Sequence, residues 1–165
     1  MDPEIIDPSR EVAKDVTMIY SDSAKVKFQI SSPQLEKYDD DGILVEEFPK
    51  GLLIEFFDDE KKVTSWVSAK YALRRSAEGT MLLKDSVMLS NQKEDILETS
   101  SILWDDLNQT LTTPKFVRII QGGESRDTLY GMGFKAKSDF SQFEIQKFYG
   151  KRRAQDLSRE FGIDN

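Results

Sequence analysis

The feature that most constrains the fold is a two-residue alternation of apolar and polar side chains, which recurs along the chain. One apolar set is Ala24, Val26, Phe28 and Ile30. Others are Val63, Val67, Ala69, Tyr71 and Leu73, then Met81, Leu83, Val87 and Leu89, then Tyr130, Met132, Phe134 and Ala136. Successive side chains of a β-strand point to opposite faces, so this period is typical of half-buried strands. The chain is predicted to be all-β.

Turn signals separate these segments at a regular step of roughly 14 to 19 residues. They are Asp41-Gly42, Asp59-Glu60, Ala77-Glu78-Gly79, Gln92-Lys93, Asp106 to Asn108, Gly122-Gly123 and Asp139-Phe140-Ser141. Strands of about ten residues, each about 33 Å long, fit between them. Long antiparallel strands with short turns predict a meander or jelly roll in two facing sheets. Such sheets have edges that are covered, charged or paired with another chain.

Two segments lack a clear alternation, because Leu52–Phe57 and Lys115–Ile120 carry apolar residues at both parities. We expect them to be buried on both faces. Only the stretch from Lys151 to Phe161 predicts a helix, since Ala154, Leu157 and Phe161 have i, i+3, i+7 spacing.

The domain organisation follows from length and composition. A chain of 165 residues with 38% hydrophobic residues suits one core. Residues 1–15, rich in Pro, Asp and Glu, are expected to form a flexible leader, residues 16–150 the β domain, and residues 151–165 a charged tail that contains the predicted helix.

Composition excludes several function classes. Without histidine or cysteine, the chain lacks the commonest general base, the usual zinc ligands and every thiol nucleophile. A net charge of −7 disfavours binding to nucleic acid. No apolar run approaches the roughly 18 residues that a membrane span needs. No catalytic residue, metal ligand or cofactor is predicted.

Three short motifs have structural explanations that we prefer. Gly131-Met132-Gly133 lacks the third glycine and the helix of a dinucleotide loop, and strand glycines mark bulges or close approaches. Asp39 to Gly42 lacks the spacing of a calcium loop and suits a solvated turn. A glycosidase could use two of Glu55, Glu98 and Glu144, but nothing in the sequence brings a pair together.

Aromatic residues are spread over nearly every predicted strand. Ordinarily they would form a closed core, as in a structural or adhesive β module. Alternatively, two sheets that splay apart would expose an apolar interior to acyl chains, each methylene contributing about 0.8 kcal/mol. A fluorescent fatty-acyl probe distinguishes these possibilities, because it partitions into an open groove and ignores a sealed core.

The order of residues from about Pro49 to Gly150 resembles the LptC family, over about 100 of the 165 residues. The landmarks are Pro49-Lys50-Gly51, Phe56 to Asp59, Ser65 to Ala69 with Ala72, Val87 to Asn91, Leu97-Glu98-Thr99, Leu103-Trp104-Asp105, Thr113 with Phe116-Val117, Gly131 to Phe134, Asp139-Phe140 and Gly150. The resemblance implies a twisted, open β-jelly roll of the OstA-like kind, whose interior holds the acyl chains of lipopolysaccharide in transit. No chemistry is implied.

The family also suggests partners and a location. It is the periplasmic component that bridges the inner-membrane lipopolysaccharide ABC transporter to the rest of the transport chain. Edge pairing with the next jelly-roll carrier is implied, as is anchoring to the inner membrane by an N-terminal segment absent from this chain. The soluble carrier of the same pathway shares the fold and is the alternative component, but Pro49-Lys50-Gly51 and Gly150 favour the bridge.

Strand parity then selects candidate residues. The predicted groove consists of Phe28, Ile54, Phe56, Val67, Ala69, Tyr71, Val87, Leu103, Phe116, Phe134 and Ile145. The predicted partner-binding edge consists of Phe148, Tyr149 and Gly150.

Overall fold

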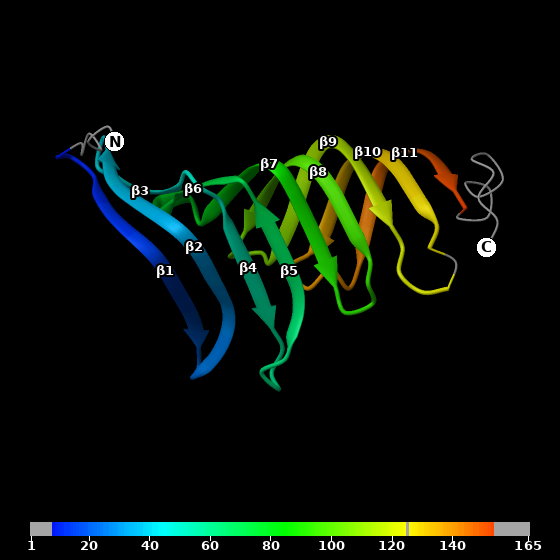
Figure 1. The fold of residues 1–165 in the computed structure, drawn as a ribbon, viewed down its shortest axis with the longest axis horizontal. Coiled ribbons are helices and arrows are strands. Elements are labelled where there is room, and N and C mark those ends of the chain that lie inside the picture. The colour runs from blue at the N-terminus through cyan, green and yellow to red at the C-terminus, as the bar shows by residue number, and fades with distance from the viewer. Residues whose placement is uncertain (1–7, 125, 154–165) are drawn as a thin grey trace, which may run out of the picture.

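The computed structural model describes residues 8–124 and 126–153, and these form antiparallel β-strands almost throughout (Figure 1). The strands are β1 (Glu11–Asp22), β2 (Lys25–Asp40), β3 (Ile43–Phe48), β4 (Leu52–Phe57), β5 (Val63–Ala69), β6 (Tyr71–Arg75), β7 (Thr80–Asn91), β8 (Ile96–Asp105), β9 (Thr110–Ile120), β10 (Thr128–Lys137) and β11 (Phe143–Arg152). In this described part, the short 3₁₀ turn η1 (Ser76–Glu78) is the one helical element. The predicted all-β class is confirmed.

Two long strands connect the layers of the jelly roll. One half of β2 pairs with β4 and the other with β3, as the pairs Phe28↔Phe56 and Tyr38↔Val45 show. β7 likewise pairs with both β5 and β6. Because β4 pairs with β5 and β3 with β6, the sheet folds over itself into two layers. β1 extends beyond β2 and β8–β11 extend beyond β7, so β1 and β11 lie at opposite ends of the long axis (Figure 1).

The core lies between these layers. Ile30, Ile54 and Leu89 are fully buried, in a cluster that also contains Phe28 and Trp104. Burying each large apolar side chain contributes about 1.5–3 kcal/mol, and this burial holds the layers together.

Register shifts interrupt most of the long strands. In β7, Asp85 and Ser86 both have positive φ, and the pairing with β8 shifts between Lys84 and Val87. Gly133 of β10 has φ +82° and lies where the pairing of β10 with β9 shifts register, between Met132 and Phe134. Such bulges bend the strand and increase its twist, which allows one sheet to curl around a core. They can also change which alternate residues face inward.

The predicted turns all fall between strands. Asp41 and Gly42 both have positive φ, as in the two-residue turns favoured by hairpins. Ser23 and Ala24 form an equivalent turn between β1 and β2. The prediction that Ala24 is a strand residue was therefore wrong.

Both predicted termini require correction where the structure describes them. β1 begins at Glu11, so the last five residues of the expected leader, 11–15, belong to a strand paired with β2. β11 continues to Arg152, so the helix expected from Lys151 does not begin there. Ala154, Leu157 and Phe161, on which that helix prediction depends, lie outside the described residues.

Candidate functional site: interior clefts and sheet edges

Most of the predicted groove residues face the interior. Those that do are Phe28, Ile54, Phe56, Val67, Ala69, Val87, Phe134 and, partly buried, Ile145. Whether they contact a ligand stays a prediction.

Tyr71, Leu103 and Phe116 lie on the outer face, contrary to the prediction that they line the groove. At Lys70 the chain bends between β5 and β6, so Ala72 takes the interior position and the Tyr71 hydroxyl bonds to Glu47 outside. Leu103 is 40% exposed, because the register shift in β8 turns Trp104 inward.

Phe116 is 47% exposed for a different reason. The segment from Lys115 to Ile120 carried two competing apolar sets, and packing selects Val117 and Ile119 for the core. Phe116 instead stacks on Tyr130 outside. The expectation of two-sided burial was wrong here and also in Leu52–Phe57, where Leu53 is exposed.

β1 contributes interior residues that the groove prediction missed. Val16, Met18 and Tyr20 are partly buried and pack against the core. Their two-residue spacing was visible in the sequence, but the segment adjoined the presumed leader and ends in a turn that we did not predict. β1 therefore forms a wall of the interior.

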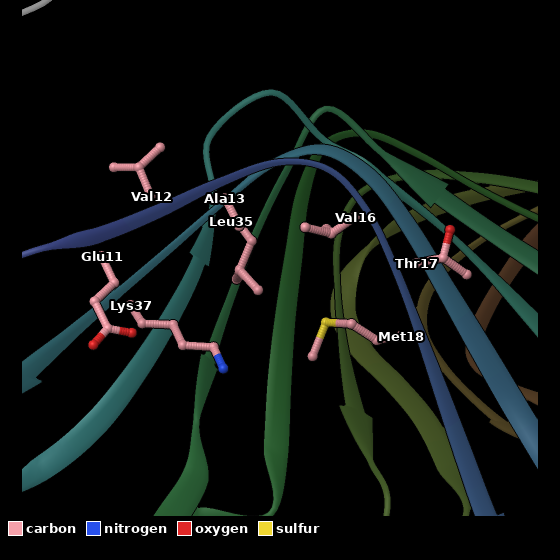
Figure 2. Close-up of a pocket in the computed structure, with 8 residues that line it drawn as sticks. All are labelled: Glu11, Val12, Ala13, Val16, Thr17, Met18, Leu35 and Lys37. Carbon is pink, nitrogen blue, oxygen red and sulfur yellow. The ribbon is translucent and has the colours of Figure 1, made fainter.

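A cleft of about 460 Å³, which we call the β1 cleft, lies beside this wall. Its lining residues are Glu11, Val12, Ala13, Val16, Thr17, Met18, Leu35 and Lys37. Figure 2 shows Leu35, Val16 and Met18 beneath the arch of β1, with the side chains of Glu11 and Lys37 at one side. The cleft is mainly apolar and carries one acid and one base.

A second cleft, of about 680 Å³, lies where the chain segments at the ends of β1, β8 and β10 come together. We call it the aromatic cleft. Tyr20 stacks on Phe28 with centroids 4.4 Å apart, and Trp104 meets Phe28 and Phe56 edge-on at 4.6 and 5.3 Å. Its remaining lining is more polar: Ser21, Asp22, Lys27, Phe57, Thr64, Asp106, Leu107, Asn108, Gln109, Lys137, Ser138 and Asp139.

The two edge strands complete the candidate site. Within the described residues, β1 pairs only with β2 and β11 only with β10. The predicted edge residues Phe148, Tyr149 and Gly150 lie on β11, where Phe148 is 56% and Tyr149 51% exposed. Tyr149 stacks on Phe116, so the outer face beside this edge is aromatic.

An ionic cluster on the outer face holds the start of β1. The Arg10 guanidinium bonds to Glu47 at 2.8 Å and lies 4.1 Å from the centroid of the Tyr38 ring. The Tyr71 hydroxyl donates to Glu47 at 2.5 Å. Burial raises the pKa of Glu47, but the hydrogen bonds from Tyr71 and Arg10 outweigh it, so this pKa is lowered. Burial and the Glu47 carboxylate raise the pKa of Tyr71.

The acidic motifs are not assembled into a catalytic or metal site. Glu55, Glu98 and Glu144 lie on β4, β8 and β11, which are not neighbours in the sheet, and Glu98 pairs with Arg118. Asp39 accepts a hydrogen bond from Gly42 N, as expected of a turn. Within residues 8–124 and 126–153 no three acidic side chains are placed to hold a metal ion. The same residues contain no helix of the length and hydrophobicity needed to cross a bilayer.

Comparison with known proteins supports the resemblance. A family model described as "LptC: Lipopolysaccharide-assembly, LptC-related" matches residues 7–147, which is most of the chain. No curated protein matches this sequence. The family match confirms the predicted family and assigns the chain a part in lipopolysaccharide transport.

Proposed function

This chain belongs to the LptC family, and we propose that it is a non-enzymatic lipopolysaccharide carrier in the periplasm. It accepts lipopolysaccharide from the inner-membrane ABC transporter and passes it to the next jelly-roll carrier. The observation that carries the proposal is a two-layered apolar interior with a cleft beneath one edge strand and a second edge strand at the opposite end.

The β1 cleft is the proposed entry for acyl chains. Each methylene that leaves water there contributes about 0.8 kcal/mol, so a few methylenes outweigh the repulsion between the acidic protein and an anionic lipid. Side chains such as Ile30 and Ile54 fill the deeper interior. A long acyl chain therefore requires the layers to separate, and β1, which pairs on one side only, is the wall that moves most easily.

Strand addition is the proposed means of transfer. An exposed edge presents backbone N–H and C=O groups that a neighbouring jelly roll can pair with in register. β11, with Phe148, Tyr149 and Gly150, faces the next carrier, and β1 faces the transporter. The transport unit is the predicted domain 16–150, extended to the bounds of the edge strands at Glu11 and Arg152.

Photo-crosslinking in an envelope-containing host tests the proposal. Crosslinkers at Met18 and Phe56, which line the two clefts, should capture lipopolysaccharide. A crosslinker at Phe134 should do so only if the layers separate, because this side chain is buried. The matched control is Lys70, which lies on the outside. Equal capture at Lys70 and Met18 would contradict an interior path.

A purified-protein measurement distinguishes the carrier from a β module with a closed core. A fluorescent fatty-acyl probe should bind saturably, and Met18→Asp should abolish binding because it places a charge in the apolar lining. Ile19→Asp, one residue along β1, serves as the control, because Ile19 is exposed and lines neither cleft. A wild-type protein that ignores the probe would favour the closed module.

A further inference from the structure

Four charged residues form a transverse row across neighbouring strands. The cross-strand pairs are Glu11↔Lys37, Lys37↔Glu46 and Glu46↔Arg74, so the charges alternate in sign from β1 through β2 and β3 to β6. Arg74 in turn pairs with the buried Met81 of β7. We call Glu11, Lys37, Glu46 and Arg74 the charge row.

The charge row faces the interior. Leu35 lies two residues from Lys37, Phe48 two from Glu46 and Ala72 two from Arg74. All three are buried in the core cluster, and they belong to the cross-strand pairs Ala13↔Leu35 and Phe48↔Ala72. Residues two apart share a face of a strand, so Lys37, Glu46 and Arg74 share the face of that cluster. Arg74 also donates to the hydroxyl of Tyr20, which reaches it from β1 at 2.7 Å.

The middle of the charge row has unused hydrogen-bonding capacity. Glu46 is only 7% exposed, yet its Oε2 has no hydrogen-bond partner. The Lys37 side chain, which lines the β1 cleft beside it, makes no hydrogen bond or ion pair with any other residue of the described chain. A buried carboxylate oxygen without a donor is costly, and adjacent opposite charges usually pair. Both groups therefore have hydrogen-bonding capacity left for a third molecule, which would reach the buried Glu46 from the side of Lys37, the one of the two that lines the β1 cleft.

We propose that Lys37 and Glu46 recognise the polar end of an acyl chain held in the β1 cleft, and thereby select acyl groups with a hydroxyl or amide close to that end. Lys37 donates to a carbonyl or anionic oxygen of the lipid. Glu46 accepts from the hydroxyl or amide N–H. The tail then runs from the charge row along Leu35, Val16 and Met18. This inference rests on the proposed carrier function and adds a direction and a selectivity to it.

Competition binding with two matched probes tests the inference: a fatty acid and the same fatty acid with a hydroxyl at carbon 3. The wild-type protein should bind the hydroxylated probe about tenfold more tightly, because a hydrogen bond to a charged acceptor is among the stronger ones. Glu46→Leu should abolish this preference while binding of the plain chain is kept. Lys37→Met should weaken both probes about equally, because both carry a carboxylate.

Control variants remove the same charges from the outer face of the sheet. Glu55→Leu and Lys135→Met should leave both affinities unchanged. Glu46→Gln keeps an acceptor and should retain part of the preference, which also covers the case in which Glu46→Leu fails to fold.

The outcomes separate the two proposals. Equal binding of both probes to the wild-type protein, with no effect of Glu46→Leu, would overturn the selectivity and leave the carrier function standing. That result would mean that only water satisfies Glu46. If neither probe binds the wild-type protein, the carrier function itself is contradicted.

Discussion

The two edges of the jelly roll are built differently. β1 pairs with β2 along nearly its whole length, and Arg10 secures its start to Glu47 of β3 across the outer face. Both strands are exposed over most of their length, and the residues that pack against the core are Val16, Met18 and Tyr20 in β1 and Phe143 and Ile145 in β11. One edge covers a cleft with charged residues at its side, and the other presents an aromatic outer face around Phe116.

We infer from this difference that the two edge strands have separate roles. β1 acts as a wall that can move to admit a ligand, and β11 acts as a strand on which a partner docks. A wall must seal an interior and stay attached to the sheet, and β1 is held at its start by Arg10. A docking strand needs an unpaired edge and exposed apolar side chains, and β11 has both, the side chains being Phe148 and Tyr149. The predictions below test this division, from the largest expected effect to the smallest.

The C-terminal end of the sheet depends on an aromatic cluster beneath β11. Phe134 is 1% exposed and meets Phe140 and Phe143 with centroids 6.0 Å away. Phe134→Ala should lower the free energy of unfolding by about 3–5 kcal/mol, because it leaves a cavity. Leu35→Ala, beside the β1 cleft, should cost about 2 kcal/mol, since an existing cleft leaves fewer contacts to lose. Urea unfolding measures both, and a larger loss for Leu35→Ala would reverse the comparison.

β11 approaches β10 closely at a glycine. A Cβ at Gly131 would lie 2.2 Å from Cγ2 of Ile145, whereas one at Gly150 would meet nothing within 4 Å. Gly131→Ala should therefore destabilise the protein by about 1–3 kcal/mol and expose β11 to hydrogen exchange. Gly150→Ala is the matched control and should change stability by less than about 0.5 kcal/mol. Similar results for the two variants would mean that β11 can shift freely.

The attachment of β1 should weaken in acid. The folded-state pKa of Glu47 is lowered from its ordinary value of 4.5, because hydrogen bonds from Tyr71 and Arg10 outweigh burial. Its contribution to stability is thus present above about pH 4.5 and is lost as the pH falls through the lowered value. Arg10→Ala should cost about 1 kcal/mol at neutral pH and increase hydrogen exchange in residues 11–14.

The pH dependence supplies the control for that prediction. In Glu47→Gln, the loss of stability below pH 4.5 should be smaller than in the wild type. Exchange that rises in β11 rather than in β1 would show that Arg10 does not secure the N-terminal edge.

The smallest effect on stability is expected at the docking edge. Tyr149→Asp should change the free energy of unfolding by less than about 0.5 kcal/mol, because this side chain is half exposed. It should weaken association with the partner jelly roll, since it places a charge beside Phe116 at the proposed interface. Titration against the purified partner measures this, with Thr17→Asp on β1 as the comparison. Unchanged affinity would remove β11 from the interface.

Sequence patterns predicted most of the turns, though not Ser23-Ala24, and most interior residues, and they failed at particular interruptions. In β8 the interior positions are odd-numbered at Leu97 and even-numbered at Ile102 and Trp104, because of the register shift between Thr99 and Leu103. Leu103 was placed inside by assuming an unbroken period of two. Phe116 was wrongly placed in the groove, because both alternations in its strand were apolar and only contacts with neighbouring strands decide between them.

The amino-acid sequence by itself determined the β class, most turn positions, the family and the apolar faces of uninterrupted strands, because each depends on local periodicity or on residue order. Only the tertiary structure decided how the charge row is assembled. Glu11, Lys37, Glu46 and Arg74 come from four strands, and each looks like an ordinary solvated charge in the sequence. Their alignment depends on register across the sheet, which backbone hydrogen bonds and bulges set together once the strands have paired.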